Sequence, residues 1–206
     1  MKTYPIMLNV QGRLAVVVGG GDVGLRKAKS LAEARANVKL IAGSALKGCA
    51  PPGVTVAAEP YRPEHLTGAA IVFACTDDSR LNSAIAADAR RTGALVNVAD
   101  CPAECDFYCP AVASDGDVVV AVGTGGSSPA LARHLRDHLE GHLPAGAGRF
   151  AALLGRLRER VRNEVPDSGK RREILNRLAE KVTFETFINE GADAVAALFE
   201  DIIASA

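Results

Sequence analysis

The sequence predicts an α/β fold built on a doubly wound parallel sheet. Two observations lead to this expectation. Short runs of β-branched and aliphatic residues alternate with helical patterns between residues 14 and 98, and a glycine-rich turn follows the first of these runs. Alternation of this kind is typical of strands connected by crossover helices. We therefore expect helices on both faces of the sheet.

The expected elements follow in chain order. The run 14–18, Leu-Ala-Val-Val-Val, is apolar throughout and suits a strand buried on both faces. A helix is expected after it, over 23–34. The polar cluster 76–79 supplies N-cap side chains for a second helix over about 80–92. The remaining strands of this part are expected over 38–42, 54–57, 70–75 and 95–98.

The pattern changes after residue 100. Two apolar runs, 107–113 and 118–122, flank the Asp-Gly hairpin signal at 114–117. A second glycine-rich loop, 123–129, opens a helix over about 130–143. Further helices are expected over about 148–165, 170–181 and 191–205. The sequence thus predicts a dinucleotide-binding domain over 1–106, a small β–α segment over 107–146 and a helical domain over 147–206.

Composition limits the partners that we expect. The 24 Lys and Arg residues balance 24 Asp and Glu residues, so the overall charge does not indicate a nucleic-acid partner. No apolar run approaches the roughly 18 residues needed to cross a bilayer, and Asn9 and Gln11 interrupt the first apolar stretch. Five cysteines are an odd number, expected as reduced thiols. We predict a cytoplasmic protein that binds neither nucleic acid nor membrane.

The turn Gly19-Gly20-Gly21-Asp22-Val23-Gly24 predicts a dinucleotide site of the Rossmann type. Gly19 permits a tight turn, Gly21 lets the backbone approach a pyrophosphate, and Gly24 allows close packing of helix on strand. The helix that follows directs its free N–H groups at the phosphates. The turn lies directly between a buried strand and a helix, which is the context that the motif requires.

The acidic residue that usually meets the adenosine ribose is missing from the end of the second strand. The sequence there is Leu-Ile-Ala-Gly-Ser over 40–44. Ser44 and backbone groups would then contact the ribose, and Lys47 would tolerate a 2′-phosphate. The residues alone leave both NAD and NADP open.

Asp100 ends the segment Asn-Val-Ala-Asp at 97–100, directly after the fifth expected strand. Ligands of open α/β sheets bind beyond the carboxyl ends of the strands, so Asp100 is a candidate reacting carboxylate. The alternative is a turn aspartate that caps the next segment.

Two groups of potential metal ligands recur at a spacing of four: Cys101, Cys105 and Cys109, and His134, His138 and His142. Prolines within the cysteine stretch disfavour a helix, and the spacing matches no usual zinc or ferredoxin pattern. The histidines fit the polar face of an amphipathic helix or a dimer contact. We predict no metal site.

These motifs together resemble the N-terminal region of the siroheme synthases. The resemblance extends over nearly the whole chain, and its segments occur in the family's order. They are the glycine turn with Arg26-Lys27-Ala28 after it, Ala-Cys-Thr-Asp-Asp at 74–78, the segment ending at Asp100, and Gly-Gly-Ser-Ser-Pro-Ala-Leu-Ala-Arg at 125–133. No methyltransferase region follows, so the chain resembles the stand-alone form.

The resemblance implies a precorrin-2 dehydrogenase, which oxidises precorrin-2 to sirohydrochlorin with NAD. Many members of the family then insert ferrous iron, and the sequence leaves open whether this chain does so. Family members are homodimers, which assigns a dimerisation role to the segment 107–146.

The resemblance also implies roles for individual residues. Asp100 matches the aspartate regarded as general base in the oxidation and as proton acceptor during metal insertion. We expect the dinucleotide contacts to be Gly19, Gly20, Gly21, Asp22, Val23, Gly43, Ser44 and Thr76.

A tetrapyrrole with eight carboxylates needs cationic or N–H donors around it. Between residues 149 and 181, ten basic residues accompany five acidic ones. A solvated helix face explains any single one of them equally well. We name as expected substrate contacts only Thr124, Ser128 and Arg133, which lie in or next to the segment 125–133 that resembles the family. Thr124 stands where some members of the family carry serine, so the hydroxyl is kept.

Three hypotheses remain. The first is the dehydrogenase, with or without iron insertion. The second is a Rossmann regulatory module that senses NAD(H), and the third is an unrelated oxidoreductase on the same fold. Asp100 and the loop 124–129 favour the first, because a sensor needs neither a reactive carboxylate nor a second glycine-rich loop.

Overall fold

The computed structural model describes residues 3–43 and 46–204. The chain divides into two compact units, Met1–Cys109 and Pro110–Ala206, and each is described here by itself. This division rests on contacts within the chain. The three-part division at residues 106 and 146 stays a prediction.

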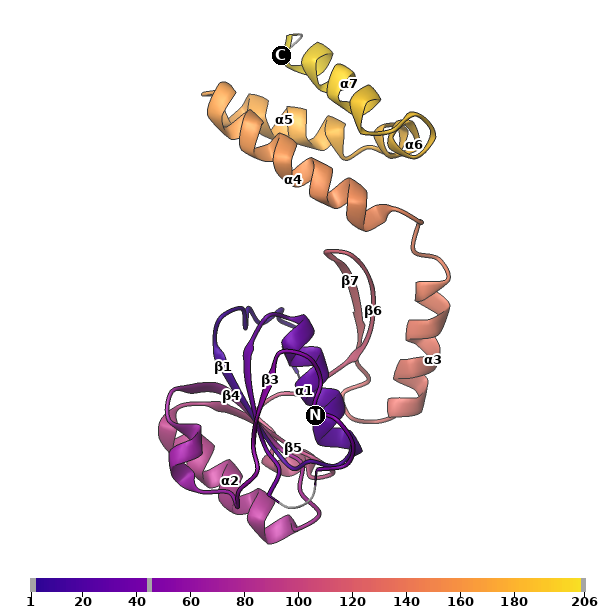
Figure 1. Ribbon diagram of the computed structural model, residues 1–206. Helices are drawn as coiled ribbons and strands as arrows, with labels where there is room; N and C mark the ends of the chain where they lie inside the picture. Colours follow the sequence, from indigo (N-terminus) through magenta and orange to yellow (C-terminus); the bar gives the residue numbers. More distant parts are fainter. Residues whose placement is uncertain (1–2, 44–45, 205–206) are drawn as a thin grey trace. The chain divides into compact units, whose positions relative to one another are not determined.

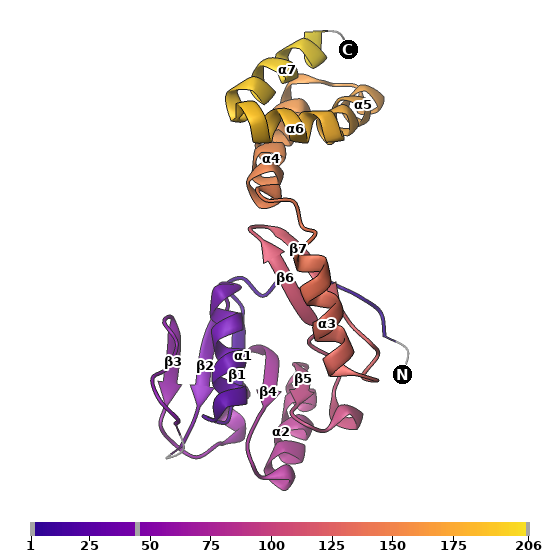
Figure 2. The ribbon, with the colours of Figure 1, turned by 90° about the vertical axis from the view of Figure 1, so that its right-hand side faces the viewer.

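The first unit is a five-stranded parallel sheet (Figure 1). Its strands follow the order β3-β2-β1-β4-β5, as Figure 2 shows. The strands are β1 (Leu14–Val18), β2 (Asn37–Ile41), β3 (Val54–Ala57), β4 (Ala69–Ala74) and β5 (Leu95–Val98). The chain moves outward from β1 to β3 and then returns to the other side of β1 with β4. The sequence-based prediction of a Rossmann-type parallel sheet is confirmed.

Helices α1 (Asp22–Glu33) and α2 (Ser79–Thr92) cover opposite faces of this sheet (Figure 1). Alternate residues of β1 divide between them, as the pleat of a strand requires. Ala15 and Val17 belong to the core on the α1 side, and Val16 and Val18 to the core on the α2 side. Burial on both faces explains why the run over 14–18 contains no polar residue.

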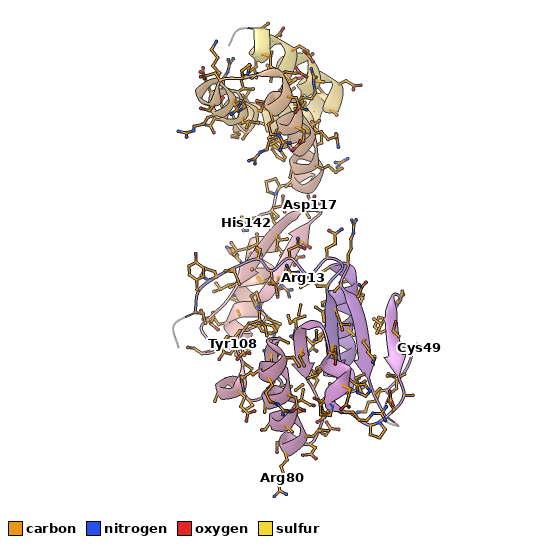
Figure 3. The ribbon with its side chains drawn as sticks, turned by 90° about the vertical axis from the view of Figure 1, so that its left-hand side faces the viewer. Arg13, Cys49, Arg80, Tyr108, Asp117 and His142 are labelled. Atoms are coloured by element: carbon orange, nitrogen blue, oxygen red, sulfur yellow. The ribbon has the colours of Figure 1, made fainter. Side chains whose placement is uncertain are left out.

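Helix α2 begins as the polar cluster predicts. Asp78 is its N-cap, and the carboxylate accepts hydrogen bonds from the backbone N–H groups of Arg80 (2.9 Å) and Leu81 (3.2 Å). Figure 3 shows the Arg80 side chain extending from this first turn away from the sheet. Two 3₁₀ turns complete the unit, Pro63–Leu66 before β4 and Pro102–Glu104 after β5.

The second unit begins with an antiparallel hairpin, β6 (Ala111–Asp115) and β7 (Val118–Val122), against which α3 (Pro129–Glu140) packs. Four helices follow: α4 (Ala147–Glu164), α5 (Ser168–Leu178), α6 (Lys181–Glu190) and α7 (Ala192–Ala204). Their shared core contains Leu157, Ile174 and Phe199. No helix in the described part of the chain is long and apolar enough to span a bilayer.

Two details of the prediction were wrong. Strand β6 begins at Ala111 rather than at 107, because Phe107 packs against Phe73 of the first unit's sheet instead. Helix α6 was not predicted at all. Its sequence, KVTFETFINE, is rich in β-branched and aromatic residues, which have low intrinsic helix propensity. Packing against α7 and the core of the helical region stabilises it.

Candidate functional site

The glycine turn brings β1, α1 and β4 into close contact. A Cβ atom on Gly19, whose φ is +119°, would lie 2.2 Å from the carbonyl oxygen of Cys75. A Cβ atom on Gly24 would lie 1.9 Å from the carbonyl oxygen of Gly19. Both glycines are therefore required by the packing of backbone on backbone, as the sequence analysis predicted for the turn and for the helix–strand contact.

Gly21 differs from the other two glycines. It is the N-cap of α1, its φ of −77° is accessible to any residue, and a Cβ atom there would meet nothing within 4 Å. It borders a cleft of about 370 Å³. The open space beside this helix N-terminus has the properties of a cradle for a pyrophosphate.

The cleft extends across the carboxyl ends of the strands. The predicted contacts Gly19, Gly20, Gly43 and Thr76 line it together with Gly21. The predicted contacts Asp22 and Val23 lie in the exposed first turn of α1 and are not among the lining residues. Ser44 lies outside the described residues. All eight dinucleotide contacts stay predictions.

Thr76 is held in place by Asn82, a residue that the sequence analysis missed. Asn82 is buried on α2, and its Oδ1 accepts hydrogen bonds from the backbone N–H (3.1 Å) and the hydroxyl (2.7 Å) of Thr76. Its Nδ2 donates to the Thr76 carbonyl oxygen at 2.9 Å. The amide thereby fixes the backbone just after the end of β4, where Thr76 lines the cleft.

Glu59 places a carboxylate in the cleft, although the end of β2 has none. It follows β3, the parallel neighbour of β2, and lines the same cleft. Its side chain forms an ion pair with Arg62 and a hydrogen bond with His65 (Oε1 to Nε2, 3.1 Å). The signal for Glu59 was present in the sequence, as an acidic residue just after the third strand, but only the strand order brings it to the cleft.

Asp100 lies at the same edge of the sheet as the glycine turn. The carboxyl ends of β1, β4 and β5 are adjacent because these strands are parallel neighbours. The Ala99 N–H donates to the Ala74 carbonyl oxygen (2.9 Å) and extends the ladder by one residue. Asp100 then adopts a left-handed conformation, with φ of +56°, and its side chain is exposed. Such a conformation is uncommon for a residue other than glycine and is often found at functional sites.

The segment after Asp100 folds back along β5, the edge strand of the sheet. The Asp106 N–H donates to the Val96 carbonyl oxygen (2.8 Å), and the Val96 N–H donates to Asp106 Oδ2 (3.0 Å). Asn97 Nδ2 donates to the Phe107 carbonyl oxygen (2.9 Å). The hydroxyl of Tyr108, which is labelled in Figure 3, donates to the Pro102 carbonyl oxygen (2.8 Å). Side chains and loop backbone thus take the place of a sixth strand.

Cys105 holds the turn that carries Asp100. Its Sγ accepts a hydrogen bond from the Val98 N–H (3.2 Å) and lies in donor range of the carbonyl oxygens of Val98 (3.2 Å) and Cys101 (3.3 Å). Burial raises the pKa of the Cys105 thiol, which keeps it protonated and able to donate. These contacts give Cys105 a structural role. Among the described residues, no group of three His, Cys, Asp or Glu side chains is arranged to hold a metal ion.

Cys75 lies between the glycine turn and Asp100. Its side chain is 8% exposed, and burial raises the pKa of the thiol to about 11. The ammonium of Lys27 lowers this pKa and the carboxylate of Asp100 raises it, although both effects are smaller than that of burial. At neutral pH the thiol is protonated, so Cys75 forms an apolar wall of the site rather than a nucleophile.

The predicted substrate contacts belong to the second unit. The Thr124 hydroxyl donates to the Ser128 carbonyl oxygen (3.0 Å) and accepts from the Ser128 N–H (3.1 Å). The Ser128 hydroxyl caps α3 by accepting from the Leu131 N–H (3.2 Å). Both hydroxyls therefore stabilise the loop that opens α3. Arg133 is exposed on the same helix. Substrate contact by these three residues stays a prediction.

Comparison with protein families matches nearly the whole chain. Residues 6–111 match the family described as "Putative NAD(P)-binding". Residues 115–142 match the central region of sirohaem biosynthesis proteins, and residues 146–203 match the sirohaem synthase dimerisation region. The three matches follow one another in the order of the elements described above.

Individual proteins show the same similarity. The chain is 39% identical to a siroheme synthase of Methylococcus capsulatus, and the match covers 100% of this chain and 44% of the relative. It is 35% identical to a siroheme synthase of Nitrosomonas europaea, where the match covers 95% of this chain and 42% of the relative. It therefore spans about two fifths of the length of these relatives. Among solved structures, the precorrin-2 dehydrogenase SirC shares the fold, with a TM-score of 0.75 at 20% identity, over 97% of this chain and 100% of that one.

Replacing Gly21 by Val tests the cleft. We expect Gly21→Val to fold, because the backbone suits a β-branched residue and nothing obstructs the Cβ atom. The side chain would fill the cleft and raise the Kd for NAD by about a hundredfold or more, as measured by calorimetry. As a control, Gly24→Ala should lose folding through its clash with Gly19. An unchanged Kd in folded Gly21→Val would remove the dinucleotide assignment.

Replacing Glu59 by Gln tests which dinucleotide the cleft prefers. In Rossmann domains an acidic residue favours NAD by accepting the ribose hydroxyls and repelling a 2′-phosphate. Glu59→Gln also frees Arg62 to bind a phosphate, so the ratio of the Kd for NADP to that for NAD should fall by about tenfold. Glu64→Gln, an exposed acidic residue nearby, should leave the ratio unchanged. A constant ratio in both variants would exclude this role for Glu59.

Proposed function

The chain belongs to the siroheme synthase family, and we propose that it oxidises precorrin-2 to sirohydrochlorin with NAD as the hydride acceptor. The observation that supports this most is the position of Asp100 at the same sheet edge as the glycine cleft, with Cys75 between them. The order of the three family matches supports the same conclusion.

The cleft fits a dinucleotide in shape and chemistry. Gly21 leaves open space at the N-terminus of α1, where phosphates are favoured by the free N–H groups. Lys47, whose backbone N–H donates to the Gly20 carbonyl oxygen (2.9 Å), and Glu59, which follows β3, also line the cleft. The dinucleotide, when bound, supplies the hydride acceptor. We infer that Glu59 orients the ribose and that the backbone of residues 19–21 holds the phosphates.

Asp100 accepts the proton in the proposed reaction. Oxidation of the tetrapyrrole removes a hydride from one carbon and a proton from a neighbouring position. An exposed carboxylate at the end of β5 is able to take that proton, and its left-handed turn is held by Cys105 and Cys101. A general base placed in this way accelerates a reaction by roughly 10²–10⁴. Insertion of ferrous iron by the same chain, with iron as a substrate, stays a prediction.

The second candidate function is an NAD(H)-sensing module. It would use the same cleft but would assign no chemistry to Asp100, the exposed carboxylate at the end of β5. The protein's cytoplasmic location also stays a prediction.

A homodimer is part of the proposal. The match of residues 146–203 to a dimerisation region supports it. A second observation concerns α3, where Leu131, Leu135 and Leu139 are each at least 40% exposed and recur every four residues on one side of the helix. Apolar stripes of this kind are typical of buried interfaces. We infer that the interface includes α3 in addition to the helical region.

Asp100→Asn tests the chemistry. The protein, NAD and precorrin-2 are mixed, and the sirohydrochlorin absorbance is followed. Wild-type protein should produce sirohydrochlorin, and Asp100→Asn should lower kcat by roughly 10²–10⁴ with the Kd for NAD unchanged. Asn tolerates the left-handed conformation as well as Asp does, so the fold should be retained. Turnover near the wild-type level in the Asn variant would leave Asp100 a turn residue and remove the base from the mechanism.

Leu135→Glu tests the dimer. Wild-type protein should sediment as a dimer at micromolar concentration. Leu135→Glu should sediment as a monomer, because a carboxylate would be buried in the apolar stripe. Leu135→Met, which keeps an apolar side chain of similar size, should remain a dimer. A wild-type monomer would contradict the homodimer, and a dimer in Leu135→Glu would exclude α3 from its interface.

A further inference from the structure

Lys27 lies on the border between the buried and exposed sides of α1. Gly24, Ala28 and Leu31 form the buried side, which packs against the sheet. Lys27 is one helical turn from Gly24 and from Leu31 and is half-buried. Its Nζ lies over the ring of Phe73, 5.4 Å from the centroid. The ammonium is therefore held toward the carboxyl end of β4 rather than extended into solvent.

The surroundings of Lys27 are those of the proposed active site. Phe73 packs edge to face with Phe107, with ring centroids 5.4 Å apart. Cys75, two residues after Phe73, lies on the same face of the sheet. The ammonium of Lys27 and the carboxylate of Asp100 both act on the pKa of the Cys75 thiol, in opposite directions. Both charges therefore lie within electrostatic range of the same thiol.

Lys27 has no carboxylate partner among the ion pairs of the described residues. Lys29, on the same helix, pairs with Glu33 at 3.9 Å. A half-buried ammonium has lost part of its hydration, and the face of one phenyl ring replaces only part of it. An anion from a ligand would complete this environment.

The dinucleotide is not the anion that best fits this position. The phosphates are expected at the first turn of α1, whereas the backbone of Lys27 lies five residues further along, about 7.5 Å of helix rise. Its ammonium lies over the ring of Phe73. The residues that line the glycine cleft include Lys47 but not Lys27. The cation of the nucleotide cleft and the cation beside Phe73 are therefore different residues at different places.

We propose that Lys27 is a specificity-determining residue that binds a carboxylate of the tetrapyrrole substrate beside Asp100. This inference rests on the proposed function, because the substrate's carboxylates are the anions in question. Phe73 is buried beneath the ammonium, and the partly exposed ring of Phe107, which packs against Phe73, suits the hydrocarbon part of the same substituent. Arg26, the preceding residue, acts on the Cys75 thiol in the same direction and adds positive charge.

The test compares Lys27→Gln with Lys29→Gln, a matched substitution on the same helix. Uroporphyrin, a stable porphyrin with eight carboxylates, serves as the binding probe, and its fluorescence is titrated with the full chain. Lys27→Gln should raise the Kd for uroporphyrin by about tenfold, since one charge-assisted hydrogen bond is lost. The Kd for NAD should stay within about twofold. Lys29→Gln should change neither constant.

Two further measurements make the result specific. Lys27→Arg keeps the positive charge and should bind uroporphyrin as wild type does. If the Gln variant fails to fold, the Arg variant still tests whether a cation at this position supports uroporphyrin binding. In turnover, Lys27→Gln should raise KM for precorrin-2 with little change in kcat. Equal uroporphyrin affinity of Lys27→Gln and wild type, or a loss of NAD affinity instead, would overturn the proposal.

The two proposals can fail separately. If wild-type protein does not oxidise precorrin-2, the proposed function fails, while the uroporphyrin titration still decides whether Lys27 binds a carboxylate. If wild-type protein oxidises precorrin-2 and Lys27→Gln matches it in both Kd and KM, only the role of Lys27 is wrong.

Discussion

The contact between the glycine turn and the end of β4 is the constraint on which the rest of the site depends. Gly19 lies against the carbonyl of Cys75, and Gly24 lies against the carbonyl of Gly19. No side chain fits at either place. Because of this close approach, α1 starts directly over the switch between β1 and β4, and its free N–H groups open into the cleft. The cation of Lys27 is carried to the same edge of the sheet by the same helix.

A second constraint comes from the end of the sheet. Strand β5 has no further strand beside it, and its backbone groups still need partners. The segment after Asp100 provides them through Asp106, Asn97 and Cys105. The chain must therefore reverse direction just after β5, and the left-handed residue of this reversal is Asp100. A structural requirement thus fixes the carboxylate that the proposed chemistry uses.

Charge in this protein is organised locally. The chain has no net charge, yet two cations, Lys47 and Lys27, lie at different parts of the same sheet edge. One lines the nucleotide cleft and the other lies beside Phe73. Two anionic ligands, a dinucleotide and a carboxylated tetrapyrrole, would need this separation. A formal charge of zero does not indicate non-specific binding to polyanions, and it is compatible with specific anion sites.

The sequence by itself determined the five strands, the two helices of the sheet and the packing roles of Gly19 and Gly24 in the turn. These features depend on local patterns: apolar runs, capping residues and the spacing of glycines. It also indicated Asp100, which lies directly after the end of a strand.

Only the tertiary structure decided the place of Glu59, because strand order sets which strand end faces the cleft. The same holds for Cys105, whose partners lie across a reversal of the chain, and for α6, where packing overcomes weak helix propensity. The surroundings of Lys27 were also decided by the tertiary structure, because Lys27 and Phe73 are far apart in the sequence and meet only in the folded chain.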